Sequence, residues 1–400
     1  MRRCILCLTL LSFAMPAWCG KKMTVEQLRE LLFSCQQDKR PDADVATALE
    51  QVELTEELTR SAMNSLIGLV NGPLSTEQIY VLEARSAYLT PPLSDLPDTP
   101  APGPAAEKTI LTLAQTYIAN TYEQLPLLAA TKTTLRFQDN TNALAASSGV
   151  GGSAKDAVTS SGLSNPVTFI RYINATARPV IIERGAEKRT TEKDPTRWGA
   201  NGSVEIQKPE PGLDLIFKEA QGAGTIRWLR WELIDRKPAG VFSFEVPRQK
   251  SKFAVDVCCF PDLKQAGIAR FYSATTGRQV AGPEASNGGG VAGDFRTDTE
   301  WHPFRTIAPY HGLLFIEPDT GIVRRMIIEA ELQPSDVVHQ MDTRIDYARV
   351  KAGQSSFIVP VRSVINSVVV PNGDSGAGGY STRTSLFTSE YSDYRPAPTK

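Results

Sequence analysis

The feature that most constrains the fold is a long series of short runs rich in β-branched and aromatic residues. From residue 167 onward these runs are separated by connections of roughly two to six residues, which suit hairpins, whereas parallel neighbours need long crossovers. The series therefore predicts an antiparallel meander. The expected strands are Val167–Ile173, Arg178–Glu183, Thr225–Asp235, Val241–Val246, Lys252–Phe260, Ile268–Ser273, Arg278–Ala281, a hairpin within 312–332, Arg344–Val350, Ser356–Val370 and Tyr380–Tyr391.

The hairpin within 312–332 carries the strongest local signal. Its arms flank Pro318-Asp319-Thr320-Gly321, where proline presets φ and glycine accepts a positive φ. In the second arm Met326 and Ile328 share an apolar face, and Arg325 lies on the other. This alternation predicts one buried and one solvent-facing side.

A sheet of about a dozen strands curls or splits rather than staying flat. We therefore expect an α+β protein with N-terminal short helices and a large curved antiparallel sheet, a half-barrel, packed against helix. Pro360 cannot donate to a strand ladder, so it predicts an edge or a bulge in its strand.

Residues 23–90 form a predicted helical region. Thr24 and Gln27 make a capping-box pair. Val25, Leu28, Leu32 and Cys35 follow at helical spacing, a second helical segment covers about Asp44–Val70 with a break near Leu54, and a third begins at Ser75.

Residues 91–106 are rich in proline, which favours an extended linker. A helix over Glu107–Leu125 leads into a strand over Thr131–Phe137. Residues 138–165 are mostly small and polar, which predicts a disordered insertion. Residues 107–394 are thus expected to be one helix-plus-antiparallel-β domain.

Residues 1–19 have the parts of a signal peptide: Arg2-Arg3, an apolar run too short to span a bilayer, and a small-residue exit before Gly20. We expect an extracytoplasmic protein, periplasmic or secreted, with no transmembrane span after signal removal. Trp18 argues against a lipoprotein, because the residue before an acylated cysteine is small. The charged fraction of 22% and the formal charge of −1 give no basic field for nucleic acid.

The order of a helix, a first strand and successive hairpins, with the strand–turn–strand Ile316–Glu331, resembles the lipoprotein-localisation half-barrel proteins of the bacterial envelope. This resemblance covers about residues 107–394 and implies a curved sheet that holds an apolar or acyl group. The chain departs from these carriers by its helical region and its polar insertion. Val257-Cys258-Cys259, Phe315–Gly321 and Leu386–Tyr391 also resemble an uncharacterised group of secreted bacterial proteins, which implies no activity.

These features predict a non-enzymatic protein that binds an apolar or acyl ligand in envelope lipid or lipoprotein handling. The expected ligand-binding residues are Trp228, Trp231, Met326 and Ile328. Trp228 and Trp231 are three apart, so a regular strand would point them to opposite faces. The alternative is a protein-interaction scaffold of the envelope without a small-molecule ligand, and a hydrolase is third. A continuous apolar cavity would favour the first function and a filled inner face the second.

No catalytic residue, cofactor or metal site is predicted. Two clusters have the residue types for chemistry: Asp294, Asp298, Glu300 and His302 as cation ligands, and Glu329, Glu331, Asp336 and His339 as acid and base groups. The first cluster is interpreted as a solvated loop and the second as the solvent-facing side of a strand, so neither is assigned a catalytic or metal-binding role. Cys35, Cys258 and Cys259 are too few for a disulfide framework, and we interpret them as small buried side chains.

Overall fold

The computed structural model describes residues 21–122, 124–139, 170–188, 205–206, 210–261, 271–273, 279–280, 291–293, 301–369 and 383–397. The predicted leader over 1–19 and nearly all of the predicted insertion over 138–165 lie outside these residues. Among the helices that the structure describes, none combines the length and apolar character needed to cross a membrane.

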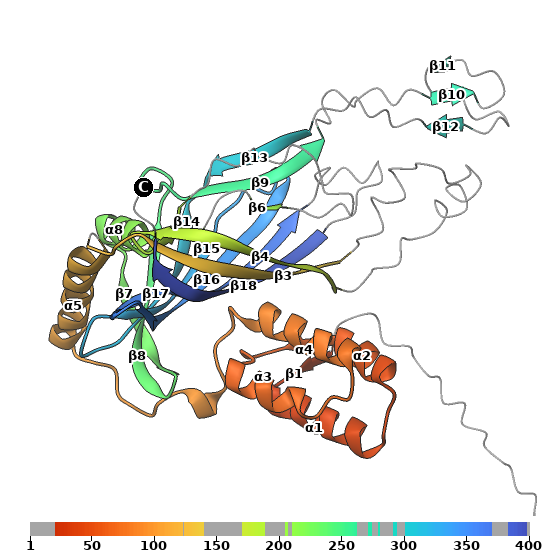
Figure 1. Cartoon of the computed structure of the whole chain (residues 1–400), viewed down its shortest axis with the longest axis horizontal. Helices are drawn as coiled ribbons and strands as arrows, with labels where there is room; N and C mark the ends of the chain where they lie inside the picture. Colours follow the sequence, from red (N-terminus) through yellow and green to blue (C-terminus); the bar gives the residue numbers. More distant parts are fainter. Residues whose placement is uncertain are drawn as a thin grey trace, which may run out of the picture.

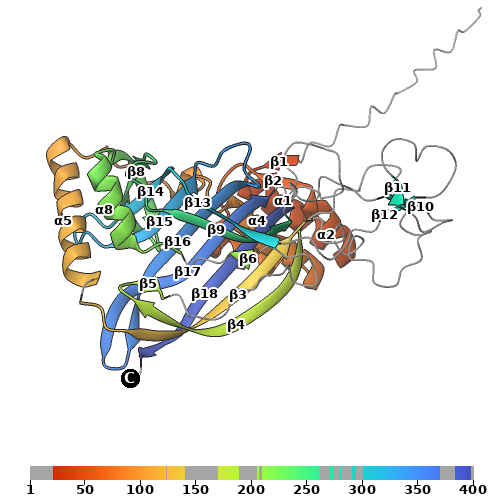
Figure 2. The ribbon, with the colours of Figure 1, turned by 90° about the horizontal axis from the view of Figure 1, so that it is seen from above.

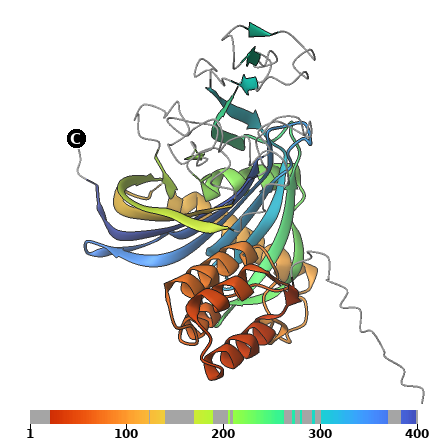
Figure 3. The ribbon, with the colours of Figure 1, turned by 90° about the vertical axis from the view of Figure 1, so that its right-hand side faces the viewer.

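Ten strands pair antiparallel in one open sheet, which curves strongly in Figure 3. This confirms the predicted α+β class with a large curved antiparallel sheet. From one end to the other the strands are β5 (Ala186–Glu187), β4 (Arg171–Glu183), β3 (Leu128–Gln138), β18 (Arg383–Pro396), β17 (Ser355–Val369), β16 (Val338–Ala352), β15 (Val323–Ala330), β14 (Tyr310–Ile316), β8 (Lys237–Val246) and β7 (Arg227–Ile234).

Smaller sheets accompany the main one. One contains β13 (Trp301–Ile307), β9 (Ala254–Pro261) and β6 (Glu205–Ile206). Another contains β11 (Gln279–Val280), β10 (Phe271–Ser273) and β12 (Val291–Gly293). The predicted hairpin over 268–281 is present as β10 and β11.

The inner face of the main sheet is packed against helix. Two helices, α5 (Pro104–Tyr122) and α8 (Leu213–Ala223), lie side by side at one end of the sheet in Figures 1 and 2. Their buried faces share the largest hydrophobic cluster with Met326 and Ile328 of β15. The helix-covered face is therefore the main core of the protein.

The outer face of the sheet carries the N-terminal helices (Figure 3). These are α1 (Val25–Gln37), α2 (Asp42–Glu50), α3 (Arg60–Ile67) and α4 (Pro73–Ser86), followed by a 3-10 turn, η1 (Leu93–Asp95). Val81 and Ala84 of α4 pack against Val364 of β17. The face of β15 opposite Met326 is therefore only partly exposed to solvent: Ile327 is buried because the helical region covers it, whereas the Glu329 side chain is solvent-accessible as predicted, at 39% exposed.

Local capping and periodicity explain α1. Thr24 and Gln27 form the predicted capping box, and the predicted apolar stripe of Val25, Leu28, Leu32 and Cys35 is buried. The break predicted near Leu54 is real, because Val52–Leu54 forms β2 and pairs parallel with β1 (Lys21–Met23). Three residues are too few to show a period-two pattern, so this short strand pair is not predicted from the sequence.

The predicted hairpin at 312–332 is formed by β14 and β15. Gly321 adopts φ 73°, and a Cβ there would lie 2.3 Å from the carbonyl carbon of Leu113 in α5. The turn needs glycine both for its conformation and for this close approach to helix α5.

Three local predictions were tested by the sheet register. Two strands predicted over 167–183 are one strand, β4, because it pairs with β3 along its length. The turn predicted over 237–240 occurs at Asp235 and Arg236, both with positive φ, as in a tight two-residue hairpin. Pro360 marks a bulge as predicted, since Tyr347 pairs with it while Asp346 pairs with Arg362.

Candidate functional site

The predicted residues Met326 and Ile328 lie in a filled core. Both side chains are 0% exposed and belong to the cluster built with α5 and α8. The cross-strand partners of Met326, Leu314 and Ile345, are also buried. This packing has the character of a solid interior around β15.

Trp228 and Trp231 lie on the same side of β7, so the prediction that they face opposite sides is wrong. The register shifts between Trp228 and Arg230, which leaves Leu229 as the extra residue of a bulge. The two indole rings then meet edge to face at 4.7 Å between centroids. Trp231 Nε1 donates to the carbonyl oxygen of Pro100, 2.9 Å away, and so fixes the segment that leads to α5.

The part of the chain that the structure describes, which includes Glu329, Glu331, Asp336 and His339, contains no group of side chains that could hold a metal ion. Glu329 and Glu331 each lie 3.4 Å from a ring nitrogen of His311, on the exposed surface. These carboxylates, led by Glu329, raise the pKa of His311. Asp294, Asp298 and Glu300 lie outside the described residues, as does the side chain of His302.

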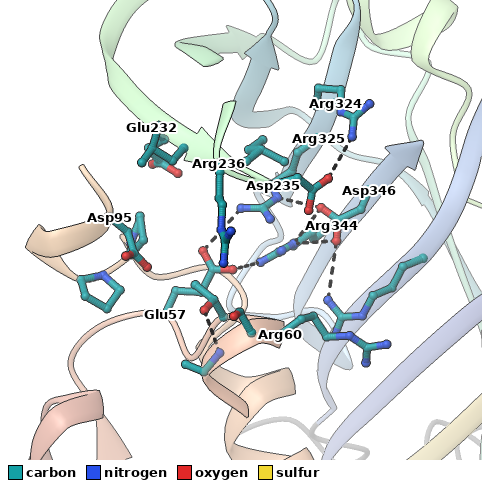
Figure 4. Close-up of a pocket in the computed structure, with 18 of the residues that line it drawn as sticks. Glu57, Arg60, Asp95, Glu232, Asp235, Arg236, Arg324, Arg325, Arg344 and Asp346 are labelled. Carbon is teal, nitrogen blue, oxygen red and sulfur yellow. Dashed lines mark hydrogen bonds and ion pairs between the residues drawn. The ribbon is translucent and has the colours of Figure 1, made fainter. Parts of the chain in front are cut away.

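An open cleft of about 1050 Å³ lies on the outer face, between the helical region and the sheet (Figure 4). One wall comes from the starts of α1 and α3 and from the segment around η1. The other comes from β7, β15, β16, β17 and β18. Half of the lining residues are charged, among them Glu57, Arg60, Arg236, Arg325, Arg344, Asp346 and Arg362.

Asp346 is the centre of the cleft floor. Its carboxylate accepts hydrogen bonds from Arg325 Nε at 2.7 Å and Arg344 Nε at 3.2 Å, and Arg362 Nη1 lies 3.6 Å away. Burial alone would raise the pKa of the Asp346 carboxyl, but Arg344, Arg325 and Arg362 outweigh it and hold that pKa well below its usual range. Asp346 is therefore ionised across the physiological pH range.

The same arginines join the sheet to the helical region. Arg344 Nη1 donates to Glu57 Oε1 at 2.6 Å and to the carbonyl oxygen of Ala87 at 2.9 Å. Arg362 Nη2 donates to both carboxylate oxygens of Glu83 in α4 at 2.6 Å. The contact between the two parts is thus strongly polar on the cleft side.

A second buried charge cluster lies on the inner face of β3. Lys132 Nζ is 2.9 Å from Glu210 and 3.0 Å from Glu187, and Ser363 donates to Glu210 at 2.6 Å. Burial would raise the pKa of Glu210, but Lys132 outweighs it and lowers that pKa to about 2. All of these groups are satisfied by one another, so the cluster anchors the chain at Glu210 to the sheet.

Asp342 also lies on the outer face, and its effect on stability at different pH values tests the cost of burying a charge. Burial, with some help from Glu329, raises its pKa to about 6. The folded protein therefore binds a proton on the Asp342 carboxyl more tightly than the unfolded chain does. Ionised Asp342 consequently lowers the stability of the fold above pH ~6, and this loss disappears as the pH falls toward ~4.

We expect Asp342→Asn to be more stable than the wild type at pH 7.5. Because the wild type regains its lost stability as Asp342 is protonated, the advantage should shrink by about 1–3 kcal/mol at pH 4.5. Urea unfolding of both proteins at the two pH values measures this change. An advantage that stays the same at both pH values would contradict the assignment.

The cleft arginines were not among the predicted site residues. Arg325, Arg344 and Arg362 occupy positions that period two assigns to a solvent-facing side, and they look identical to ordinary surface arginines in the sequence. One signal was present: Arg344 and Asp346 sit two apart on the same face of one strand, between apolar neighbours. Such a pair of opposite charges suits a buried ion network as well as a wet face.

The fold and the cleft together define an open antiparallel half-barrel with a helical region docked on its outer face and a charged cleft between them. Comparison with protein-family models, curated proteins and solved structures finds no match.

Proposed function

We propose that this protein is a non-enzymatic binding scaffold, which uses the cleft between its helical region and its sheet to hold a polar segment of a protein partner. The observation that carries this proposal is the position of the open space. It lies on the outer face and half of its lining residues are charged, whereas the apolar inner face is filled around Met326 and Ile328.

The chemistry of the cleft supports a protein ligand over an acyl chain. An acyl chain gains affinity by burying apolar area, but the cleft offers it arginine and carboxylate groups that would lose water without compensation. A polar peptide can exchange hydrogen bonds with these groups instead. The volume of about 1050 Å³ is enough for several peptide residues.

An extracytoplasmic location belongs to the same proposal and is supported by the signal-peptide pattern over residues 1–19. The partner would then be a protein of the envelope or of the secreted fraction.

Selection from a random peptide library displayed on phage tests the proposal. Enriched peptides should bind the wild type and bind Ser61→Trp at least about tenfold more weakly, because Ser61 is exposed on the cleft wall and an indole there fills the space. Asn64→Trp is the matched control, since Asn64 is exposed on the same helix and does not line the cleft.

Equal binding of the selected peptides to wild type and Ser61→Trp would move the binding site away from the cleft. Failure to enrich any peptide would argue against the scaffold.

A further inference from the structure

The cleft lining contains seven arginines and eight carboxylates, and these groups are unequally paired. The carboxylates of Glu57 and Asp346 each accept hydrogen bonds from arginine. Arg362, by contrast, is 5% exposed, and its Nε and Nη1 have no hydrogen-bond partner within the described ranges. A second carboxylate oxygen, Asp346 Oδ2, lies 3.6 Å from Nη1, beyond hydrogen-bond distance.

A buried cation with unused donors is costly to maintain. Burial lowers the pKa of Arg362 even though Glu83 acts in the opposite direction. Because Nε and Nη1 have almost no accessible surface, the Arg362 side chain would turn toward the cleft to let a bound anion supply the missing acceptors.

The start of α3 adds a second group of donors to the same cleft. Thr59, Arg60 and Ser61 all line it. The Thr59 side chain caps the amide of Ala62, so the amides of Arg60 and Ser61 are left for other acceptors. No acidic residue stands in the first turn of α3 to neutralise this positive helix end.

Two further arginines can reach an anionic ligand. Among the residues that the structure describes, Arg60 forms an ion pair with Glu390 alone, across a solvent-exposed contact that exchanges readily. Arg236 is exposed in the turn between β7 and β8, makes no ion pair with any described residue, and extends over the cleft toward Glu57 in Figure 4.

We propose that the partner segment held by the cleft is acidic. One of its carboxylates would bind at the α3 N-terminus beside Arg60 and Arg362, and a second would meet Arg236. This inference rests on the proposed function, because it names the chemistry of the ligand for the same cleft. Hydrogen bonds between arginine and carboxylate are charge-assisted, which makes them stronger than neutral ones.

The test uses fluorescein-labelled hexaglutamate and hexaglutamine peptides, with fluorescence anisotropy read at about 0.15 M salt. Hexaglutamate should bind the wild type about tenfold more tightly than hexaglutamine, and Ser61→Trp should abolish the difference. Arg60→Gln should weaken hexaglutamate binding about fivefold, while Arg248→Gln, an exposed arginine outside the cleft, should leave it unchanged.

Because Arg362→Gln could fail to fold, Arg362 is tested in the wild type by NMR. Titration with hexaglutamate should shift the backbone amide signals of Arg60 and Ser61 and the Nε–H signal of Arg362. Absence of these shifts at a saturating peptide concentration would overturn the assignment of the anion position.

The two proposals fail in different ways. Selected peptides that bind in the cleft but are neutral or basic would overturn the acidic ligand and leave the scaffold in place. Hexaglutamate that binds Ser61→Trp as tightly as the wild type would also overturn the acidic-segment proposal, because its binding would then lie elsewhere.

Discussion

Replacing Met326 by alanine is expected to lower the free energy of unfolding by about 2–5 kcal/mol. Met326 is fully buried in the cluster that β15 shares with α5 and α8, so the truncation removes packed atoms and leaves a cavity. Urea unfolding of the variant and the wild type measures the loss. Leu229→Ala is the control, since Leu229 is 45% exposed and its truncation should change stability by less than about 0.5 kcal/mol.

The same variant separates the scaffold from an acyl-binding protein. If Met326 lined a space open to an acyl chain, its truncation would cost distinctly less than the filled-core value. A lipid present at ~100 times its dissociation constant would then add ~2.7 kcal/mol to the stability of the wild type. A small loss of unfolding free energy in Met326→Ala, together with such a gain when extracted envelope lipid is added, would favour an acyl-binding protein over the cleft scaffold.

Much of the fold follows from local rules that act within a few residues. The Thr24–Gln27 capping box and the Pro318–Gly321 turn each use side chains that serve one backbone geometry, and both form as predicted. Periodicity likewise identifies the buried stripe of α1 and the buried face at Met326. These features depend little on which distant segment packs against them.

The features that the sequence did not reveal depend on distant partners. Ile327 is buried because the helical region covers the outer face, and nothing near residue 327 signals that cover. The bulge at Leu229 moves Trp228 and Trp231 to one side, and a single extra residue leaves the alternation of residue types almost unchanged. A single strand at Arg171–Glu183 replaces two because pairing with β3 overrides the local polar sequence.

The candidate site shows the same limit more strongly. Periodicity reports which residues share a face of a strand, but it does not distinguish a charge in water from a charge that a remote partner neutralises. Arg344 finds Glu57 only after the chain has folded two separate regions against each other. The cleft is therefore a product of tertiary packing, and its residues could be selected only from the structure.

Replacing Arg344 by methionine is expected to lower the free energy of unfolding by about 3–5 kcal/mol, because removal of one partner leaves buried charge uncompensated. Arg344 is 3% exposed, and the variant would deprive Glu57 and Asp346 of a cation and the Ala87 carbonyl of a donor.

Exposed ion pairs give the matched comparison for Arg344. Arg60→Gln breaks a contact whose two side chains are 42% and 53% exposed, so its cost should stay below about 1 kcal/mol. Because Arg344 joins β16 to the segment 57–87, its loss should also speed amide hydrogen exchange in α3 and α4 more than in β14. A cost for Arg344→Met no larger than that for Arg60→Gln would show that water already compensates these charges, and the cleft floor would then not act as a fixed ion network.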